Sequence, residues 1–368
     1  MLKAARHQRA GIALCTLALA ACTPLHQRIL VPPRPDAAQL QQSDTLLERA
    51  QARREQFTVA DVPLLSYLVF EPRNYDLDYQ VLRDERLFGV RWQLGEPGPV
   101  QEPVGSIVLL HGWSADGRFL LPWAMRLAEQ GYRTIVPDLR NHGRSGTAPA
   151  GFGTREADDV LALLAHLHER GQLPSPVHLF GVSWGAVTAL YAAAQWSTAG
   201  IGATAGAVIA IEPFANAADA IRTAISGLLQ TAPHLRWHER AARATLRRRY
   251  GADRVEQAID RAGADIDLDL RTLDVATVLQ RVPVCVLHIH GRVDTLIPVQ
   301  TARELAAVQP RNLYLELPDD GHFSSTARAD WLAGPIGFWL PAATATPPGL
   351  PCPPLPLPTD PAGMLPDD

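Results

Sequence analysis

Short apolar runs alternate with amphipathic stretches along most of this chain. The apolar runs lie at 106–110, 132–136, 177–180, 207–211, 282–289 and 312–317, and helical periodicity fills 120–130, 156–169, 184–195 and 302–308. Short buried strands that alternate with helices are typical of a parallel sheet with helices on both faces. The pattern therefore predicts an α/β fold with a mostly parallel central sheet. In such sheets, the residues that carry chemistry gather at the carboxyl ends of the strands.

One long interval interrupts this alternation. Between residues 211 and 282 lie about seventy residues with helical periodicity and no strand pattern, too many for a simple crossover connection. We therefore expect a helical lid, at about 213–281, over the active face. Before the alternation begins, apolar and polar positions take turns through 67–93, which predicts antiparallel strands.

The first residues have the composition of a secretory signal. Three basic residues precede an apolar run at 12–21 that is too short for a permanent transmembrane helix. The run ends in Leu19-Ala20-Ala21-Cys22, which resembles the lipobox of bacterial lipoproteins. The resemblance implies that residues 1–21 are a removed signal peptide and that Cys22 is lipidated. An ordinary cleaved signal peptide or an uncleaved anchor is the alternative.

Thr23 bears on the destination of such a lipoprotein. An aspartate after the lipidated cysteine would, in the lipoprotein resemblance, favour retention in the inner membrane, but this chain has a threonine there. The resemblance thus implies attachment to the outer membrane, with the body facing the periplasm of the bacterial envelope.

The mature chain divides into a predicted tether, domain and tail. Residues 22–60 are polar and punctuated by prolines, with one short helix expected around 43–56, and residues 61–340 form the domain. Residues 341–368 contain ten prolines and little apolar periodicity, so we expect a disordered tail. A disulfide between Cys285 and Cys352 would tie a buried strand to that tail, so we expect both thiols to be free.

Composition and charge exclude some functions. About half of the 368 residues are apolar and a fifth are charged, which suffices for a large core without a disulfide framework. The formal net charge of −4 becomes −7 without residues 1–21, because they carry three positive charges and no negative ones. This acidity argues against a nucleic-acid partner.

Arginines are frequent in the predicted lid. A solvated helix face is their first explanation, and contact with anionic lipid head groups or an acidic substrate is the alternative. They are Arg236, Arg240, Arg243, Arg247, Arg248, Arg249 and Arg254.

The pentapeptide Gly181-Val182-Ser183-Trp184-Gly185 follows the apolar run 177–180 and precedes an alanine-rich helix. A G-x-S-x-G sequence in that position is typical of a nucleophile elbow, in which a sharp strand-to-helix turn exposes the serine hydroxyl. Ordinary turns also contain glycine and serine, so the motifs elsewhere in the chain must show whether this pentapeptide is a nucleophile elbow. Ser183 is the predicted nucleophile.

A base and an acid for this serine follow later strands. Asp294 lies on the loop after 282–289, and His322 lies just after 312–317. The chain order Ser183, Asp294, His322 matches the order of an α/β-hydrolase triad. Glu212, just past 207–211, is the alternative acid.

Two further motifs carry a resemblance to a known family. His111-Gly112-Trp113 follows one strand, and the segment 137–145, with sequence PDLRNHGRS, follows the next. With the triad motifs, they make residues 104–340 resemble an α/β-hydrolase, most similar to the serine aminopeptidase-like branch that also contains esterases, monoacylglycerol lipases and thioesterases. The resemblance implies an oxyanion hole made by the backbone N–H groups of Trp113 and Trp184. It also implies that the Trp184 ring, where that branch often carries methionine, narrows the acyl pocket.

The remaining histidines are predicted to be structural. His111 and His142 belong to the motif loops, and His288 and His290 share a strand face without a third ligand at convincing spacing. We therefore expect no metal and no other cofactor.

The predicted activity is hydrolysis of a lipid-like or small carboxylic ester through an acyl-enzyme. The alternatives are a peptidase, amidase or thioesterase with the same triad, or a non-catalytic envelope binding protein on a hydrolase fold.

Overall fold

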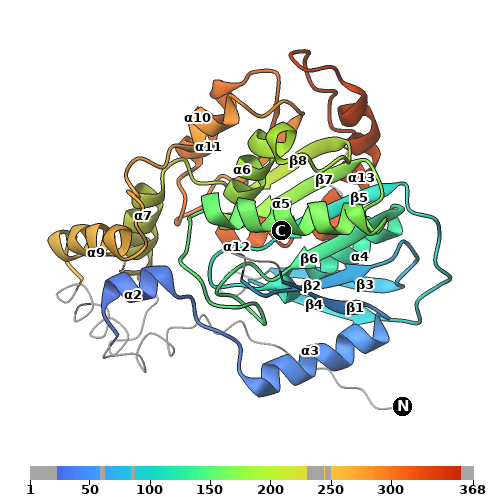
Figure 1. Ribbon diagram of the computed structural model, residues 1–368, viewed down its shortest axis with the longest axis horizontal. Coiled ribbons are helices and arrows are strands. Elements are labelled where there is room, and N and C mark those ends of the chain that lie inside the picture. The colour runs from blue at the N-terminus through green and yellow to red at the C-terminus, as the bar shows by residue number, and fades with distance from the viewer. Residues whose placement is uncertain (1–22, 59–62, 84–87, 230–243, 245–249, 358–368) are drawn as a thin grey trace.

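A computed structural model describes residues 23–58, 63–83, 88–229, 244 and 250–357 of the chain (Figure 1). The predicted signal peptide at 1–21, the predicted lipidation site Cys22 and the end of the predicted tail lie outside the described residues. The arginines between 236 and 249 of the predicted lid also lie outside the described residues.

Among the described residues, eight strands form the central sheet in the order β1-β2-β6-β5-β7-β8-β9-β10. The strands are β1 (Arg53–Phe57), β2 (Leu65–Phe70), β5 (Gly105–Leu110), β6 (Tyr132–Pro137), β7 (Val177–Val182), β8 (Ala205–Ile211), β9 (Val286–Gly291) and β10 (Leu313–Leu317). From β6 to β10 all neighbours are parallel, and β1 and β2 extend the sheet antiparallel. Strands β3 (Leu77–Arg83) and β4 (Phe88–Leu94) form a separate antiparallel pair. The predicted mostly parallel sheet is confirmed.

Helices cover both faces of this sheet. They are α2 (Leu25–Leu30), α3 (Ala37–Arg49), η1 (Gly117–Leu120), α4 (Leu121–Glu129), α5 (Thr154–Glu169), α6 (Trp184–Ala199), α7 (Ala217–Leu229), α9 (Ala252–Asp265), α10 (Val275–Leu279), α11 (Val299–Val308), α12 (His322–Ser325) and α13 (Ala329–Ala345). On β5, Val108 and Leu110 pack in one core with α5 and α6. Ile107 and Leu109 point to the other face and pack in a second core with α4 and α13. Alternate side chains of one buried strand thus stabilise opposite layers.

The insertion between β8 and β9 is helical where the structure describes it. Helices α7, α9 and α10 lie in this interval, as the periodicity of 213–281 predicted. In Figure 1, α7 and α9 lie on the left of the molecule, beside the N-terminal helix α2. His26 of α2 lies 3.6 Å from the carboxylate of Asp265 at the end of α9.

The predicted tether at 22–60 is corrected by the structure. Strand β1 is the edge strand of the central sheet, so the domain includes residues before 61. The helix expected around 43–56 is α3, which begins earlier because Asp36 caps it by accepting the Gln39 backbone N–H. The segment is rich in polar residues, but its apolar side chains Leu47 and Phe57 are buried in the two cores, which composition alone does not show.

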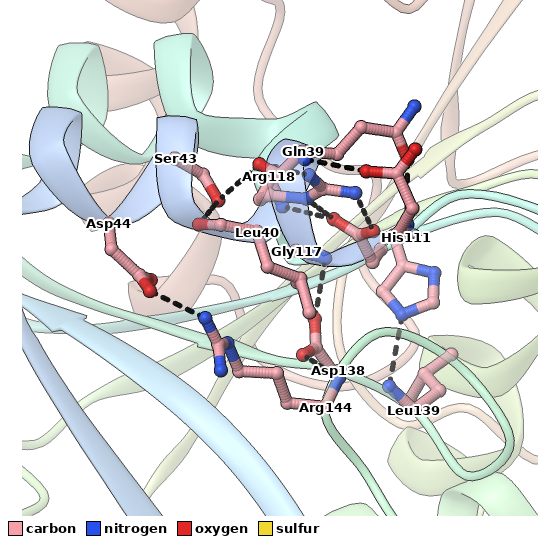
Figure 2. Close-up of polar contacts among 12 residues, drawn as sticks. Gln39, Leu40, Ser43, Asp44, His111, Gly117, Arg118, Asp138, Leu139 and Arg144 are labelled. Carbon is pink, nitrogen blue, oxygen red and sulfur yellow. Dashed lines mark hydrogen bonds and ion pairs between the residues drawn. The ribbon is translucent and has the colours of Figure 1, made fainter. Parts of the chain in front are cut away.

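Two ion pairs and a main-chain contact hold α3 on the domain (Figure 2). Asp44 lies 2.6 Å from the Arg144 guanidinium, as Figure 2 shows. It also lies 2.8 Å from the Arg54 guanidinium on β1. Arg118 donates to the backbone carbonyl of Gln39 at 3.1 Å. Helix α3 therefore contacts both η1 and the loop that follows β6.

The predicted disordered tail at 341–368 is wrong for its described part. Helix α13 continues to Ala345, and the segment after it returns over the domain, where Trp339 donates its indole N–H to Pro353 at 2.7 Å. Cys352 is buried and forms a disulfide with Cys285, so the two thiols are not free. The proline content misled the prediction because proline fixes φ and removes a donor but does not prevent packing.

No helix among the residues described here is long and apolar enough to cross a membrane.

The disulfide closes a loop of the chain with a sequence separation of 67 residues. Because a cross-link restricts the unfolded chain, we expect Cys352→Ser to lower the free energy of unfolding by about 2–4 kcal/mol. Urea denaturation with and without dithiothreitol measures this. Reductant should destabilise the wild type and leave Cys352→Ser unchanged, and equal stability of all four samples would contradict the prediction.

Candidate active site

Ser183 lies at the turn between β7 and α6. Its φ of +53° is in the left-handed region, which non-glycine residues rarely adopt. The turn is crowded: a Cβ on Gly185 would lie 2.0 Å from the carbonyl oxygen of Leu110, and one on Gly181 would lie 2.2 Å from that of Gly185. The Ser183 N–H donates to Ile211 on β8 at 2.7 Å. The pentapeptide therefore has the geometry of the predicted nucleophile elbow.

His322 and Asp294 meet at the same edge of the sheet. His322 begins α12 after β10, and Asp294 lies on the loop after β9. The His322 Nδ1 is 2.8 Å from Asp294 Oδ2. The other carboxylate oxygen of Asp294 accepts the backbone N–H groups of Leu296 and Ile297 at 2.7 and 2.9 Å. The acid is thereby held in place to orient the imidazole.

Glu212 contacts the same histidine. Its Oε2 lies 3.1 Å from His322 Nδ1, and its Oε1 accepts a hydrogen bond from the Ser325 hydroxyl. Its side chain is fully buried, and burial together with the nearby Asp294 charge raises the pKa of the Glu212 carboxyl well above its usual range. The two residues that the sequence offers as alternatives are thus brought together. Sequence reasoning missed Ser325, which no motif marked.

A cavity of about 400 Å³ opens onto Ser183 and His322. Its other lining residues are Gly112, Trp113, Ser114, Ala115, Asp116, Arg118, Phe119, Val182, Phe323 and Thr326. Three aromatic side chains of the lining, Trp113, Phe119 and Phe323, are exposed to solvent by 38%, 42% and 58%. The charges of Asp116 and Arg118 neutralise each other at 2.6 Å. The cavity therefore offers mainly apolar contacts beside the serine.

The Trp184 ring does not narrow this cavity, so that prediction is wrong. The ring is 5% exposed and packs against Phe152, with the ring centres 4.5 Å apart, and against His142. It points into the core because it starts α6 on the side that faces α5. Trp113, in contrast, lines the cavity, next to Gly112, where an added Cβ would lie 3.4 Å from Ser183 Cβ.

The two motif loops hold the cavity wall together (Figure 2). His111 Nε2 accepts the Leu139 N–H at 3.0 Å, and Asp138 accepts the backbone N–H groups of Gly117 and Arg144 at 2.9 and 2.8 Å. His142 packs edge-on against His111, and burial lowers the pKa of His142 to about 3. Both histidines are thus structural, as predicted.

Three side chains at this edge of the sheet are of types that bind metal ions. Within the described ranges, the one cluster of three such side chains is Glu212, Asp294 and His322, whose ligand atoms lie within 4.8 Å of one another. These side chains already contact each other. The strand pair His288 and His290 is not in it, and burial lowers the pKa of His288 to about 4.

Comparisons with known proteins agree with this fold. Residues 107–334 match the family model described as the alpha/beta hydrolase family. The esterase Pf2001 of Pyrococcus furiosus superposes with a TM-score of 0.55 at 15% identity, covering 84% of this chain and 97% of that one. This likeness shows the fold alone.

Two curated relatives match over short segments. The uncharacterized protein YqkD of Bacillus subtilis is 30% identical over 93 residues, which are 25% of this chain and 30% of YqkD. A Mycobacterium phage D29 protein named as a non-heme haloperoxidase is 47% identical over 54 residues, 15% of this chain. The chain thus spans 30% of the length of YqkD and 19% of the length of the phage protein.

The crowding at the elbow generates a prediction. We expect Gly185→Ala to lower the free energy of unfolding by about 1–3 kcal/mol or more, because the added methyl meets the backbone of β5. Gly89→Ala is the control, since an added Cβ there has no neighbour within 4 Å among the described residues. Thermal melts of both variants measure this, and equal melting temperatures would contradict the proposed close packing.

Proposed function

The chain belongs to the α/β-hydrolase family, and we propose that it is a serine hydrolase that cleaves carboxylic esters through an acyl-enzyme intermediate. The observation that carries the proposal is the placement of Ser183 and His322 on one cavity, with Asp294 bound to the far nitrogen of the imidazole. This arrangement supplies a nucleophile, a base and an acid that orients the base.

The proposed mechanism uses these groups in turn. His322 removes the Ser183 proton as the hydroxyl oxygen attacks the ester carbonyl, and Asp294 stabilises the imidazolium without taking its proton. The backbone N–H groups of Trp113 and Trp184 bind the oxyanion. The imidazolium then protonates the leaving alkoxide. A water molecule, deprotonated by the same histidine, hydrolyses the acyl-enzyme and frees Ser183.

The substrate we propose is a lipid-like or small ester. The aromatic residues Trp113, Phe119 and Phe323 around the serine favour apolar groups on the substrate. The closed ion pair between Asp116 and Arg118 leaves no strong selection for a charged one. Amides, peptides and thioesters react through the same triad and are outcomes of the test below.

We also propose attachment to the bacterial outer membrane through lipidated Cys22, with the body in the periplasm. The support comes from the sequence around Cys22 and from the disulfide between Cys285 and Cys352, because disulfides persist in oxidising compartments.

The catalytic prediction concerns Ser183. A fluorophosphonate probe should label the purified wild type covalently, and Ser183→Ala should remain unlabelled because it lacks the attacking oxygen. The melting temperature of Ser183→Ala checks its folding. Equal labelling of the two proteins, or no labelling of folded wild type, would refute the serine mechanism.

The same wild-type protein then distinguishes the bonds. p-Nitrophenyl esters of increasing chain length are compared with aminoacyl anilides and acyl thioesters. Faster turnover of the esters supports an esterase. Faster turnover of the anilides or thioesters would replace it by the peptidase or thioesterase alternative.

The attachment prediction concerns Cys22. Without the thiol, lipidation cannot occur, so Cys22→Ser should move the protein from the membrane pellet to the soluble fraction. Immunoblots of fractionated cells measure this, with the wild type as the reference and the melting temperature of Cys22→Ser as a check on its folding. Cys22→Ser that stays in the pellet would refute lipid attachment at this residue.

A further inference from the structure

Two carboxylates from neighbouring strands face one imidazole nitrogen. Glu212 follows β8 and Asp294 follows β9, and these strands pair in parallel with Ile211 opposite Ile289. Their carboxylate oxygens lie 3.1 Å and 2.8 Å from the Nδ1 of His322. Both side chains are completely buried. An enzyme that needs one acid therefore has a second one at nearly the same distance.

The two carboxylates differ in their hydrogen bonds. Asp294 accepts two backbone N–H groups besides the histidine, and donors of this kind stabilise an ionised carboxylate. Glu212 accepts a hydrogen bond from the Ser325 hydroxyl on Oε1, and its carboxylate also has a backbone hydrogen bond from Gly291. Hydrogen bonds thus hold Asp294 on the backbone of its own loop and hold Glu212 against Ser325 on α12.

The pKa of Glu212 reflects this environment. Burial is the main cause that raises it well above the usual range, and the negative charges of Asp294 and Asp320 add to the effect. Of the facing histidines, His322 contacts both carboxylates, and His290 lies 3.5 Å from Asp294. Burial lowers the pKa of His290, so this ring is neutral. Burial beside Asp294 therefore favours the protonated form of Glu212.

We propose that Glu212 is a second positioning carboxylate of His322, which accepts the Nδ1–H of the imidazole when Asp294 is absent. This role rests on the proposed function, in which His322 is the base. Removal of Asp294 removes the nearest like charge, which favours ionisation of Glu212. Its Oε2 is then a charged acceptor 3.1 Å from Nδ1.

The first test compares ester turnover by wild type, Asp294→Ala, Glu212→Gln and the double variant. Loss of a solitary triad acid lowers kcat by about 10⁴-fold. We expect Asp294→Ala to lose about 100-fold at most, Glu212→Gln less than about 10-fold because Asp294 remains, and the double variant about 10⁴-fold. A loss of about 10⁴-fold in Asp294→Ala, with no further loss in the double variant, would overturn the proposal.

The pH profile separates positioning from mere structural support. A carboxylate beside an imidazole favours the imidazolium, so the acid limb of kcat/KM moves to lower pH when the last carboxylate is removed. We expect the limb of Asp294→Ala to stay near that of the wild type and the limb of the double variant to move down. Equal downward movement in both variants would overturn the proposal.

Glu316→Gln is the matched control for the carboxylate-to-amide change. Glu316 lies on β10 in the same sheet, but its carboxylate pairs with Arg303 at the surface, 2.8 Å away. This variant should leave turnover and the pH profile unchanged. Melting temperatures of all variants show which of them fold.

A titration without turnover distinguishes failure of this inference from failure of the proposed function. The His322 ring is titrated by NMR in Ser183→Ala, with and without Asp294→Ala and Glu212→Gln, and its signals are assigned by their loss in His322→Gln. We expect the midpoint to fall clearly only when both carboxylates are removed. A full fall with Asp294→Ala alone would overturn the role of Glu212, whatever the natural substrate is.

Discussion

The close approach of helix α6 to strand β5 is the constraint on which the site depends. Gly185 permits this approach because it has no Cβ. A Cβ at this position would lie 2.0 Å from the Leu110 carbonyl oxygen on β5. The approach forces Ser183 to a positive φ, which costs about 1–3 kcal/mol for a non-glycine residue. Packing of the two cores and the Ser183 N–H bond to Ile211 offset this cost. The strain places the serine at the carboxyl edge of the sheet, beside the cavity.

The same edge gathers ionisable groups that a protein interior otherwise excludes. Glu212 follows β8 as Ser183 follows β7, and its φ of +54° is also in the left-handed region. Two buried carboxylates at one imidazole are compatible with folding because backbone N–H groups stabilise the charge of Asp294 and the Ser325 hydroxyl contacts Glu212. Strand geometry therefore brings the two acids together beside one imidazole, and burial raises the pKa of Glu212.

Sequence patterns predicted the sheet, its covering helices and the helical character of the insertion after β8, because each depends on local periodicity. They also predicted Ser183, Asp294 and His322 as neighbours, because residues after parallel strands meet at one edge. The pairing of Cys285 with Cys352, the course of the chain beyond Ala345 and the direction of the Trp184 ring depend on contacts between distant segments, which periodicity does not record. For the same reason Glu212 and Asp294 looked like alternatives: their distance from one nitrogen is a property of the folded edge alone.

Both chain ends outside the family match support the site. The match covers residues 107–334. Before it, α3 contacts Arg118 beside the cavity and Arg144 on the loop after β6 (Figure 2). One helix thus stabilises two segments near the site. After it, Cys352 is joined to Cys285, which directly precedes β9, and the opposite end of β9 leads to Asp294. Since triad geometry tolerates little displacement, these flanking segments stabilise the positions on which the proposed chemistry depends.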